Sequence, residues 1–373
     1  MGAALIGNWL RQSISSQRVT STPVNSAPLY QSSNGLLELD LEARESIVNL
    51  GDRQAYLLTY NGQIPAPRLE AKPGDRVRIH FTNNLEQPTN IHYHGLHIPI
   101  TGNADNVFLK IEPREKLTYE FQIPDTHPSG TFWYHPHLHG LVAEQLFGGL
   151  AGLFIVRGEL DSIPEALAAQ EEFLVLQDFS LDNDGKRSDS AHMSLMMGRE
   201  GNIITVNGQV NPSLNLPAGG LLRLRILNAS PSRFYRLALE DHTFYQIATD
   251  GNSLNEPVEV DELLLTPGQR ADILVRGAVR PRADDRTGRT SSAVRRRGSQ
   301  GAEETSAHDP SRNQPRPKGT RIKKKESGQY RLLNLPYDRG SMGMMGRNNR
   351  DEPIVATINY ASAVEPLALP VCA

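Results

Sequence analysis

Apolar and polar residues alternate in short runs along most of the chain. A period of two is typical of β-strands with one buried face, whereas a helix would repeat every 3.6 residues. Residues 76–82 show the alternation most clearly, because Val77, Ile79 and Phe81 share one face and His80 lies on the other, where it is expected in solvent. The same pattern predicts strands at residues 36–42, 54–60, 116–123, 150–156, 173–179, 203–208, 221–230, 329–336 and 354–358, with two more between 258 and 276.

Short strands separated by turns predict an all-β chain, and its 373 residues are enough for two domains. Strands at this spacing are typical of Greek-key sandwiches or barrels. In strand 221–230, Arg223 and Arg225 are expected to point outward. The expected organisation is a disordered leader at residues 1–35, a first domain at 36–158, a second domain at 172–361 and a tail at 362–373.

Residues 277–328 interrupt the second domain with almost no large apolar side chains. The segment holds 14 Lys and Arg against 6 Asp and Glu, a net charge of +8, whereas the rest of a chain of net charge −3 carries −11. Such a composition cannot bury enough apolar surface to fold. A disordered insertion is expected, and a basic arm that binds nucleic acid or an anionic surface is the alternative. No specific nucleic-acid partner is expected.

Histidine is concentrated in two clusters, residues 92–97 (HYHGLH) and 133–140 (WYHPHLHG). Eleven histidines in this chain would produce about 0.3 His-x-His pairs by chance, whereas three are present. Because residues i and i+2 of a strand point to the same face, each pair aims two imidazoles into one space. Neutral imidazole suits zinc, copper, iron or nickel. Hydrogen-bonded histidines in a β-rich core are the alternative.

The surroundings of these histidines resemble multicopper oxidases, in particular the laccase-like bacterial type with three domains. The resemblance extends from about residue 37 to 360 and rests on residues 61–67 (NGQIPAP), 73–75 (PGD), 92–95 (HYHG) and 130–137 (GTFWYHPH). It implies tandem cupredoxin domains, of which the second binds no copper. It also implies a trinuclear copper cluster that reduces dioxygen to water, with ligands from both N-terminal His-x-His motifs.

Matched position by position, the resemblance assigns His92 to the type 2 copper of that cluster. It assigns His94, His135 and His137 to the type 3 pair. The sequence thus offers half of the cluster imidazoles that the family uses. The outer histidines of the two clusters, His97 and His139, fall where the family has no ligand, and we expect them to be supporting or structural.

Two further residues are candidates for supporting roles. Asp105, in the loop 102–106, matches an acidic residue that helps to deliver protons to the reduced oxygen in the family. A plain surface turn would have the same composition and is the alternative. Gln145 is a supporting candidate on a weaker match.

The other potential ligands are scattered. His192 and His242 are isolated and expected to be structural or solvated. Residues 341–346 (SMGMMG) are either a flexible loop or a soft thioether site for Cu(I). The single cysteine, Cys372, excludes an intrachain disulfide and has no histidine near it in sequence. It is therefore expected to be an inert thiol rather than a type 1 copper ligand.

The third cupredoxin domain of the family supplies a His-x-x-His-x-His and a His-Cys-His motif, and neither occurs in this sequence. After His242 the remaining histidine is His308, inside the insertion. Two hypotheses stay open. The chain is a truncated multicopper oxidase that works when another chain supplies the missing half, or it is a two-domain copper-binding protein with no oxidase activity of its own. The isolated chain favours the second hypothesis, because electrons enter the family through type 1 copper.

Residues 1–10 form a short apolar run without a basic flank, which is either the remnant of an export signal or a frayed tail. Because the family is commonly exported in bacteria, a periplasmic or extracellular location is expected. No run of 18 apolar residues occurs, so no membrane span is expected. The expected partners are dioxygen, a reducing substrate and a chain that supplies the missing domain. Phenols, metal ions and bilirubin-like pigments all remain open as substrates.

Overall fold

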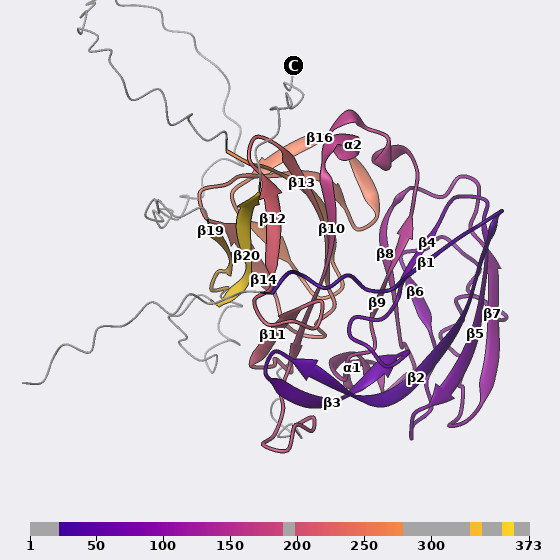
Figure 1. Cartoon of the computed structure of the whole chain (residues 1–373). Coiled ribbons are helices and arrows are strands. Elements are labelled where there is room, and N and C mark those ends of the chain that lie inside the picture. Colours follow the sequence, from indigo (N-terminus) through magenta and orange to yellow (C-terminus); the bar gives the residue numbers. More distant parts are fainter. Residues whose placement is uncertain (1–21, 189–197, 279–328, 338–352, 362–373) are drawn as a thin grey trace, which may run out of the picture.

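The computed structural model describes residues 22–188, 198–278, 329–337 and 353–361, and these form two β-sandwich domains side by side (Figure 1). Within these ranges, helix is confined to short connections: α1 (Val142–Phe147), α2 (Pro164–Ala168) and the 3-10 turn η1 (Glu159–Asp161). No helix among the described residues is long and apolar enough to cross a membrane.

The first domain packs a four-stranded sheet against a five-stranded sheet. Alternation puts Val77, Ile79 and Phe81 into the core between the sheets and leaves His80 exposed, as predicted. The four-stranded sheet has the order β3 (Arg53–Tyr60), β2 (Leu36–Leu50), β5 (Arg76–Asn84), β7 (Lys116–Gln122). The five-stranded sheet has the order β1 (Leu29–Gln31), β4 (Arg68–Ala71), β9 (Gly152–Val156), β8 (Gly130–His135), β6 (His92–His94).

The first domain begins before residue 36, so the expected leader of residues 1–35 is too long. Strand β1 pairs in parallel with β4, with Leu29 opposite Arg68. All three residues of β1 are exposed, because an edge strand needs only backbone hydrogen bonds and no apolar side chain. The polar composition therefore gave no sign of it. Residues 1–21 of the expected leader lie outside the described residues.

The second domain repeats the sandwich with a six-stranded and a five-stranded sheet around its own core. The six-stranded sheet has the order β11 (Ile203–Val206), β10 (Gln170–Phe179), β13 (Leu221–Asn228), β18 (Arg270–Arg276), β15 (Phe244–Thr249), β16 (Asn252–Val260). The five-stranded sheet has the order β12 (Ser213–Pro217), β20 (Ile354–Ala361), β19 (Gln329–Asn334), β14 (Tyr235–Leu239), β17 (Leu263–Leu265). The expected insertion falls between β18 and β19, and its residues 279–328 lie outside the described part of the chain.

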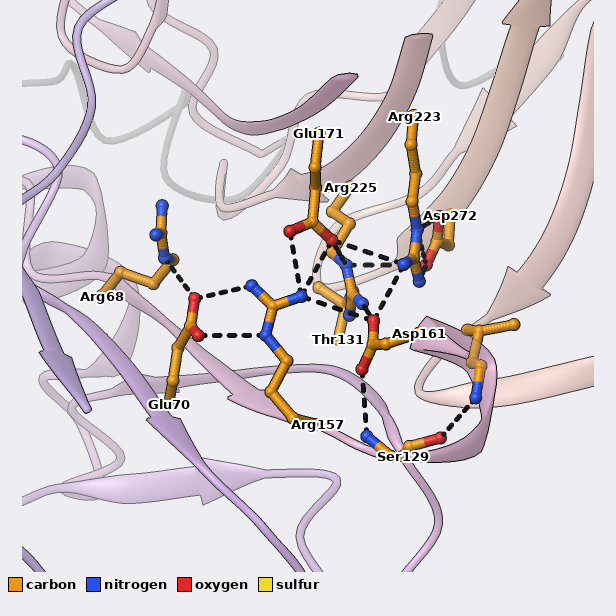
Figure 2. Close-up of polar contacts among 12 residues, drawn as sticks. Arg68, Glu70, Ser129, Thr131, Arg157, Asp161, Glu171, Arg223, Arg225 and Asp272 are labelled. Carbon is orange, nitrogen blue, oxygen red and sulfur yellow. Dashed lines mark hydrogen bonds and ion pairs between the residues drawn. The ribbon is translucent and has the colours of Figure 1, made fainter. Parts of the chain in front are cut away.

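A cluster of four arginines and four carboxylates joins the two domains (Figure 2). Arg223 and Arg225 alternate with core residues and so point outward as predicted, but into this cluster rather than into solvent. Both side chains are at most 2% exposed. Strand β13 lies in the interior of the six-stranded sheet, between β10 and β18. The connection between the domains covers the face of β13 that carries the two arginines, which bind Asp161 of this connection. Alternation defines two faces of a strand but not what packs on each, so the sequence alone missed this burial. The cluster comprises Arg68, Glu70, Arg157, Asp161, Glu171, Arg223, Arg225 and Asp272.

The charges of this interdomain cluster are matched pair by pair. Asp272 accepts from the Nη2 of Arg223 at 2.6 Å, and Glu171 accepts from the Nε of Arg225 at 2.7 Å. On the first-domain side, the Nε of Arg157 donates to Glu70 at 3.0 Å, and its Nη1 reaches Glu171 at 3.0 Å. Removing one partner of a fully buried pair such as Arg223 and Asp272, both 2% exposed, leaves a charge unpaired, which costs about 3–5 kcal/mol. The cluster therefore stabilises one relative placement of the two sandwiches.

The interdomain cluster makes stability depend on pH. Burial opposes the charges of Asp161 and Glu171, but attraction from Arg225 and its neighbours outweighs burial and lowers the pKa of both carboxyls. A lowered folded-state pKa adds stability that is complete above the unfolded value of about 4 and is lost as the pH falls through the folded value. We expect the free energy of unfolding in urea to decrease between about pH 5 and pH 3. Glu171→Gln should flatten this slope and cost about 1–3 kcal/mol at pH 7.

The matched control for Glu171→Gln is Glu159→Gln, because Glu159 is exposed and lies outside the interdomain cluster. It should keep both the stability and the pH slope of the wild-type chain. Equal free energies of unfolding for Glu171→Gln and the wild type at pH 7 would show that the cluster does not stabilise the fold.

Candidate metal centre

Strands β6 and β8 bring the two histidine clusters together. They pair antiparallel, with His92 opposite His135 and His94 opposite Trp133. Because alternate residues of a strand share a face, the three imidazoles and the indole lie on one side of the sheet. The intervening residues, Tyr93 and Tyr134, point to the other side and are fully buried in the core. Their burial fixes the register that presents the histidines.

The imidazoles of this face lie within the span of a metal site. The ring centroid of His92 is 5.5 Å from that of His94 and 5.3 Å from that of His135. The Nδ1 of His94 is 3.4 Å from the Nε2 of His135. One ligand atom from each of the three residues lies within 4.8 Å of the others. Nitrogen donors at this spacing are suited to transition-metal ions.

His137 completes the set from outside the strand pair. The chain leaves β8 at Pro136, and the backbone N–H of His137 donates to the Oδ1 of Asn90 at 2.7 Å. Its ring centroid is 5.0 Å from that of His92 and 6.0 Å from that of His135. His135 is 4% exposed, whereas His137 is exposed. The four rings that the sequence singled out therefore converge, and the cluster opens outward on the side of His137.

Hydrogen bonds select the nitrogen that each ring presents. The Nδ1 of His92 donates to the carboxylate of Asp105 at 2.8 Å, and the Nδ1 of His135 donates to the Pro136 carbonyl at 2.8 Å. Both rings therefore keep the lone pair on Nε2, which is the atom available to a metal. A second partner on the far nitrogen is the usual way in which proteins orient a metal-binding histidine.

Asp105 lies directly against the cluster, as the sequence analysis expected. Its side chain is 7% exposed, and its Oδ1 also accepts from the backbone N–H of Tyr93 at 2.9 Å. The neighbouring Asn90 amide donates to two carbonyls of the same loop, those of Val107 and Leu109. The loop is thus held by the residues that precede β6. The geometry shows Asp105 orienting His92; its part in proton delivery stays a prediction.

The electrostatics of the site keep two of the imidazoles, those of His94 and His135, neutral. Burial, followed by the positive charge of Arg270, lowers the pKa of His94 to about 4. Burial also lowers the pKa of His135 well below its ordinary value, and the neighbouring His92 adds to this effect. Only the neutral imidazole has a lone pair for a metal. Both rings are therefore in the ligand form at neutral pH.

Trp133 forms a wall of the metal face. Its ring stacks on His135 with centroids 4.0 Å apart and on His94 with centroids 5.0 Å apart. Both stacks are close to parallel, at 26° and 25°. The indole therefore restrains two of the candidate ligands at once, and it is only 2% exposed.

The remaining sequence candidates lie around this centre without joining it. His97 is exposed, and its backbone N–H donates to the Nε2 of His127 at 2.9 Å. His139 is exposed as well. Gln145, on α1, accepts from the Thr89 hydroxyl at 2.7 Å and so supports the segment that leads into β6. His192 and His308 and the cysteine Cys372 lie outside the described residues.

Sequence analysis missed three residues that shape the centre, namely Asn90, Trp133 and Arg270. Trp133 is two residues before His135, so strand alternation alone was sufficient to place it on the metal face. Asn90 stands just before the first His-x-His pair but carries no motif of its own. Arg270 comes from the second domain, and no local pattern connects it to the histidines.

The fold and the histidine cluster define a tandem cupredoxin-like protein with a candidate transition-metal centre in its first domain. Two family models, both described as multicopper oxidase, match residues 42–161 and 167–283. The chain belongs to the multicopper oxidase family.

The similar proteins include some named multicopper oxidase and others named cell division protein FtsP. The chain is 32% identical over 247 residues to the multicopper oxidase mco of Staphylococcus epidermidis, which covers 65% of this chain and 54% of that protein. It is 34% identical over 222 residues to the cell division protein FtsP of Gallibacterium anatis, covering 58% and 46%. The structure of a multicopper oxidase from Campylobacter jejuni, described as a metallo-oxidase, superposes with a TM-score of 0.72 at 25% identity. That match covers 94% of this chain and 63% of the other. The chain spans about half the length of the curated relatives it matches.

The donor set fits the copper that this family implies. Imidazole nitrogen is a good ligand for copper, and the three ligand atoms that lie together are all imidazole nitrogens. His94 and His135 are neutral, and His92 and His135 are oriented by their far nitrogens. His92, His94 and His135 would therefore be able to hold copper.

We expect Asp105→Asn to weaken copper binding by about 10–100-fold, because the amide cannot hold the Nδ1–H of His92 as a carboxylate does. The measurement is a competition between the full-length chain and a chelator of known copper affinity. The control is Asp125→Asn, since Asp125 is exposed, its carboxylate lies beside Gly74, and it is not one of the residues of the candidate metal site. Wild-type affinity in Asp105→Asn would show that this carboxylate does not orient a ligand.

Proposed function

We propose that this chain is a copper-binding oxidoreductase, which couples oxidation of a reducing substrate to the reduction of dioxygen to water. The observation that supports it best is the convergence of His92, His94 and His135, whose ligand atoms lie within 4.8 Å of one another. His137 adds a fourth imidazole at the open side. In this proposal His92 holds the type 2 copper, and the other three hold the type 3 pair.

The residues of the chain prepare this site rather than carry out the redox chemistry. Bound copper supplies the path by which electrons reach oxygen. His94 and His135 enter binding without first losing a proton, because burial keeps them neutral. Asp105 orients His92, and both hydrogen bonds it accepts from described residues go to Oδ1. Its Oδ2 is the atom that we propose to hold and pass a proton toward the open side of the cluster.

Turnover would need more than this sequence contains. The sequence includes one cysteine and no His-Cys-His motif, so the type 1 copper and the other cluster ligands are proposed to come from elsewhere, such as another chain. If none is supplied, the alternative is a two-domain copper-binding protein without oxidase activity. The proposed location is periplasmic or extracellular, in line with the apolar run at residues 1–10.

The similarity to cell division proteins supports a second candidate function. Relatives named cell division protein FtsP are as similar to the first two domains as those named multicopper oxidase. A role in division that does not use copper would leave the four imidazoles without a purpose. We therefore favour the copper-dependent function, and copper binding is the property that separates the two candidates.

The test is a copper titration of the full-length chain, followed by an assay for oxidation of a phenolic dye. The wild-type chain should bind copper, and His135→Ala should weaken binding at least about tenfold, because it removes a ligand rather than a residue that supports one. Copper-loaded chain alone should show neither blue thiolate–copper absorption nor dye oxidation. Cell extract that provides the missing ligands should restore oxidation.

His80→Ala is the control for this titration, because His80 is an exposed imidazole that bonds Glu38 and Thr118 on another sheet. It should bind copper as the wild type does. If His135→Ala and His80→Ala have the same affinity as the wild type, the proposed site is wrong. Dye oxidation by the isolated, copper-loaded chain would instead contradict the need for a partner.

A further inference from the structure

The second domain packs directly against β8, the strand that carries His135. The turn at Gly251 lies close to two residues of β8. A Cβ on Gly130 would come within 2.4 Å of the Gly251 carbonyl, and a Cβ on Gly251 would come within 2.4 Å of the Phe132 ring. The turn at Gly268 lies against the metal face itself. A Cβ built there would be 3.4 Å from the Cε1 of His94 and 3.5 Å from the Trp133 ring.

Arg270 is the charged residue of this contact. Its side chain is 4% exposed, and its Nε donates to the backbone carbonyl of Thr131, in β8, at 3.0 Å. Its Nη1 donates to the Gly268 carbonyl at 3.0 Å and lies 3.2 Å from the Oδ1 of Asp250. Its Nη2 lies over the backbone of Gly95, where a Cβ would be only 2.8 Å away. One guanidinium thus contacts the strand before His135 and the turn after His94.

We propose that Arg270 is a positioning residue through which the second domain sets how tightly His94 and His135 hold copper. This inference rests on the proposed function, since it concerns the same copper ligands. The second domain has no His-x-His motif, yet it supplies the guanidinium that joins the two ligand-bearing segments.

The sheet alone does not hold these segments together at this point. Strand β6 pairs with β8 only from His135 to Trp133, so Thr131 lies two residues beyond the last pair. The chain turns away from β6 at Gly95, which has a φ of +88°. Arg270 supplies a donor to β8 beyond that turn. The planar guanidinium directs its donors at fixed angles, so it restrains both segments in a way that a lysine ammonium cannot.

A purely structural ion pair would be the simpler role for Arg270. Its carboxylate partner, however, is 41% exposed and therefore weakly coupled, whereas its contact with Thr131 in β8 is buried. The turn at Gly268, whose carbonyl Arg270 binds, also lies against His94, because a Cβ there would be 3.4 Å from the Cε1 of that ring. Both observations favour an effect on the ligands over an effect on the fold alone.

The experiment compares Arg270→Met, Arg270→Lys and Arg236→Met in the full-length chain. Arg236 is the matched control: it also pairs with a carboxylate, Glu262, but it lies on β14, away from the histidines. The dissociation constant for Cu(II) is measured against a chelator, the EPR spectrum of the bound Cu(II) reports its ligand geometry, and the melting temperature of the metal-free chain reports stability.

Arg270→Met should raise the dissociation constant by about 10–100-fold and change the copper hyperfine splitting, as expected when a group that orients ligands is lost. The dissociation constant of Arg270→Lys should lie between those of Arg270→Met and the wild type, because lysine keeps the positive charge but lacks the planar guanidinium with its fixed donors. Arg236→Met should match the wild type in affinity and spectrum. If Arg270→Met does not fold, Arg270→Lys decides the question by the same readouts.

Arg270 variants with wild-type affinity and an unchanged spectrum, but a lower melting temperature, would reduce the residue to a structural role and overturn the inference. That outcome leaves the proposed function intact. If the wild-type chain itself does not bind copper, the proposed function fails, and this inference fails with it.

Discussion

The antiparallel pairing of β6 with β8 determines whether the chain has a metal centre. It sets His92 opposite His135 and places the alternate residues, Tyr93 and Tyr134, in the core. A slip of one residue would exchange the two faces and turn the imidazoles into the sandwich. The tyrosines oppose such a slip. The Tyr134 hydroxyl donates to the Pro67 carbonyl at 2.7 Å, and the Tyr93 ring packs on Phe121 with centroids 4.7 Å apart.

This strand pair depends in turn on the second domain. Arg270 and the turns at Gly251 and Gly268 contact β8 or the metal face, and the interdomain cluster of charges keeps the two sandwiches in place. A domain without copper motifs therefore has a physical task in this fold. Its turn at Gly268 lies against the face of the ligand strands that points away from the core of the first domain.

The period-two pattern was sufficient to predict most of the longer strands and to put His92 and His94 on one face, because both follow from the geometry of a single strand. Their convergence with His135 depends on the pairing of β6 with β8, and His137 lies beyond the end of β8. The pattern predicted His80 in solvent correctly. It put Arg223 and Arg225 outward but did not predict their burial, since this face becomes an interface only when the second sandwich packs on the first. It also failed for β1, whose pairing depends on backbone atoms alone. The role of Arg270 could not be predicted either, because its partner Thr131 lies in the other domain.

X-ray absorption at the copper edge, on the full-length chain loaded with an equimolar amount of copper, tests the central claim most directly. The account predicts that the spectrum is dominated by scattering from imidazole, as expected for the nitrogen donors that histidines provide. His135→Ala should weaken this imidazole scattering. A spectrum dominated by oxygen ligands, or one that His135→Ala leaves unchanged, would contradict the claim that β6 and β8 together build a copper site.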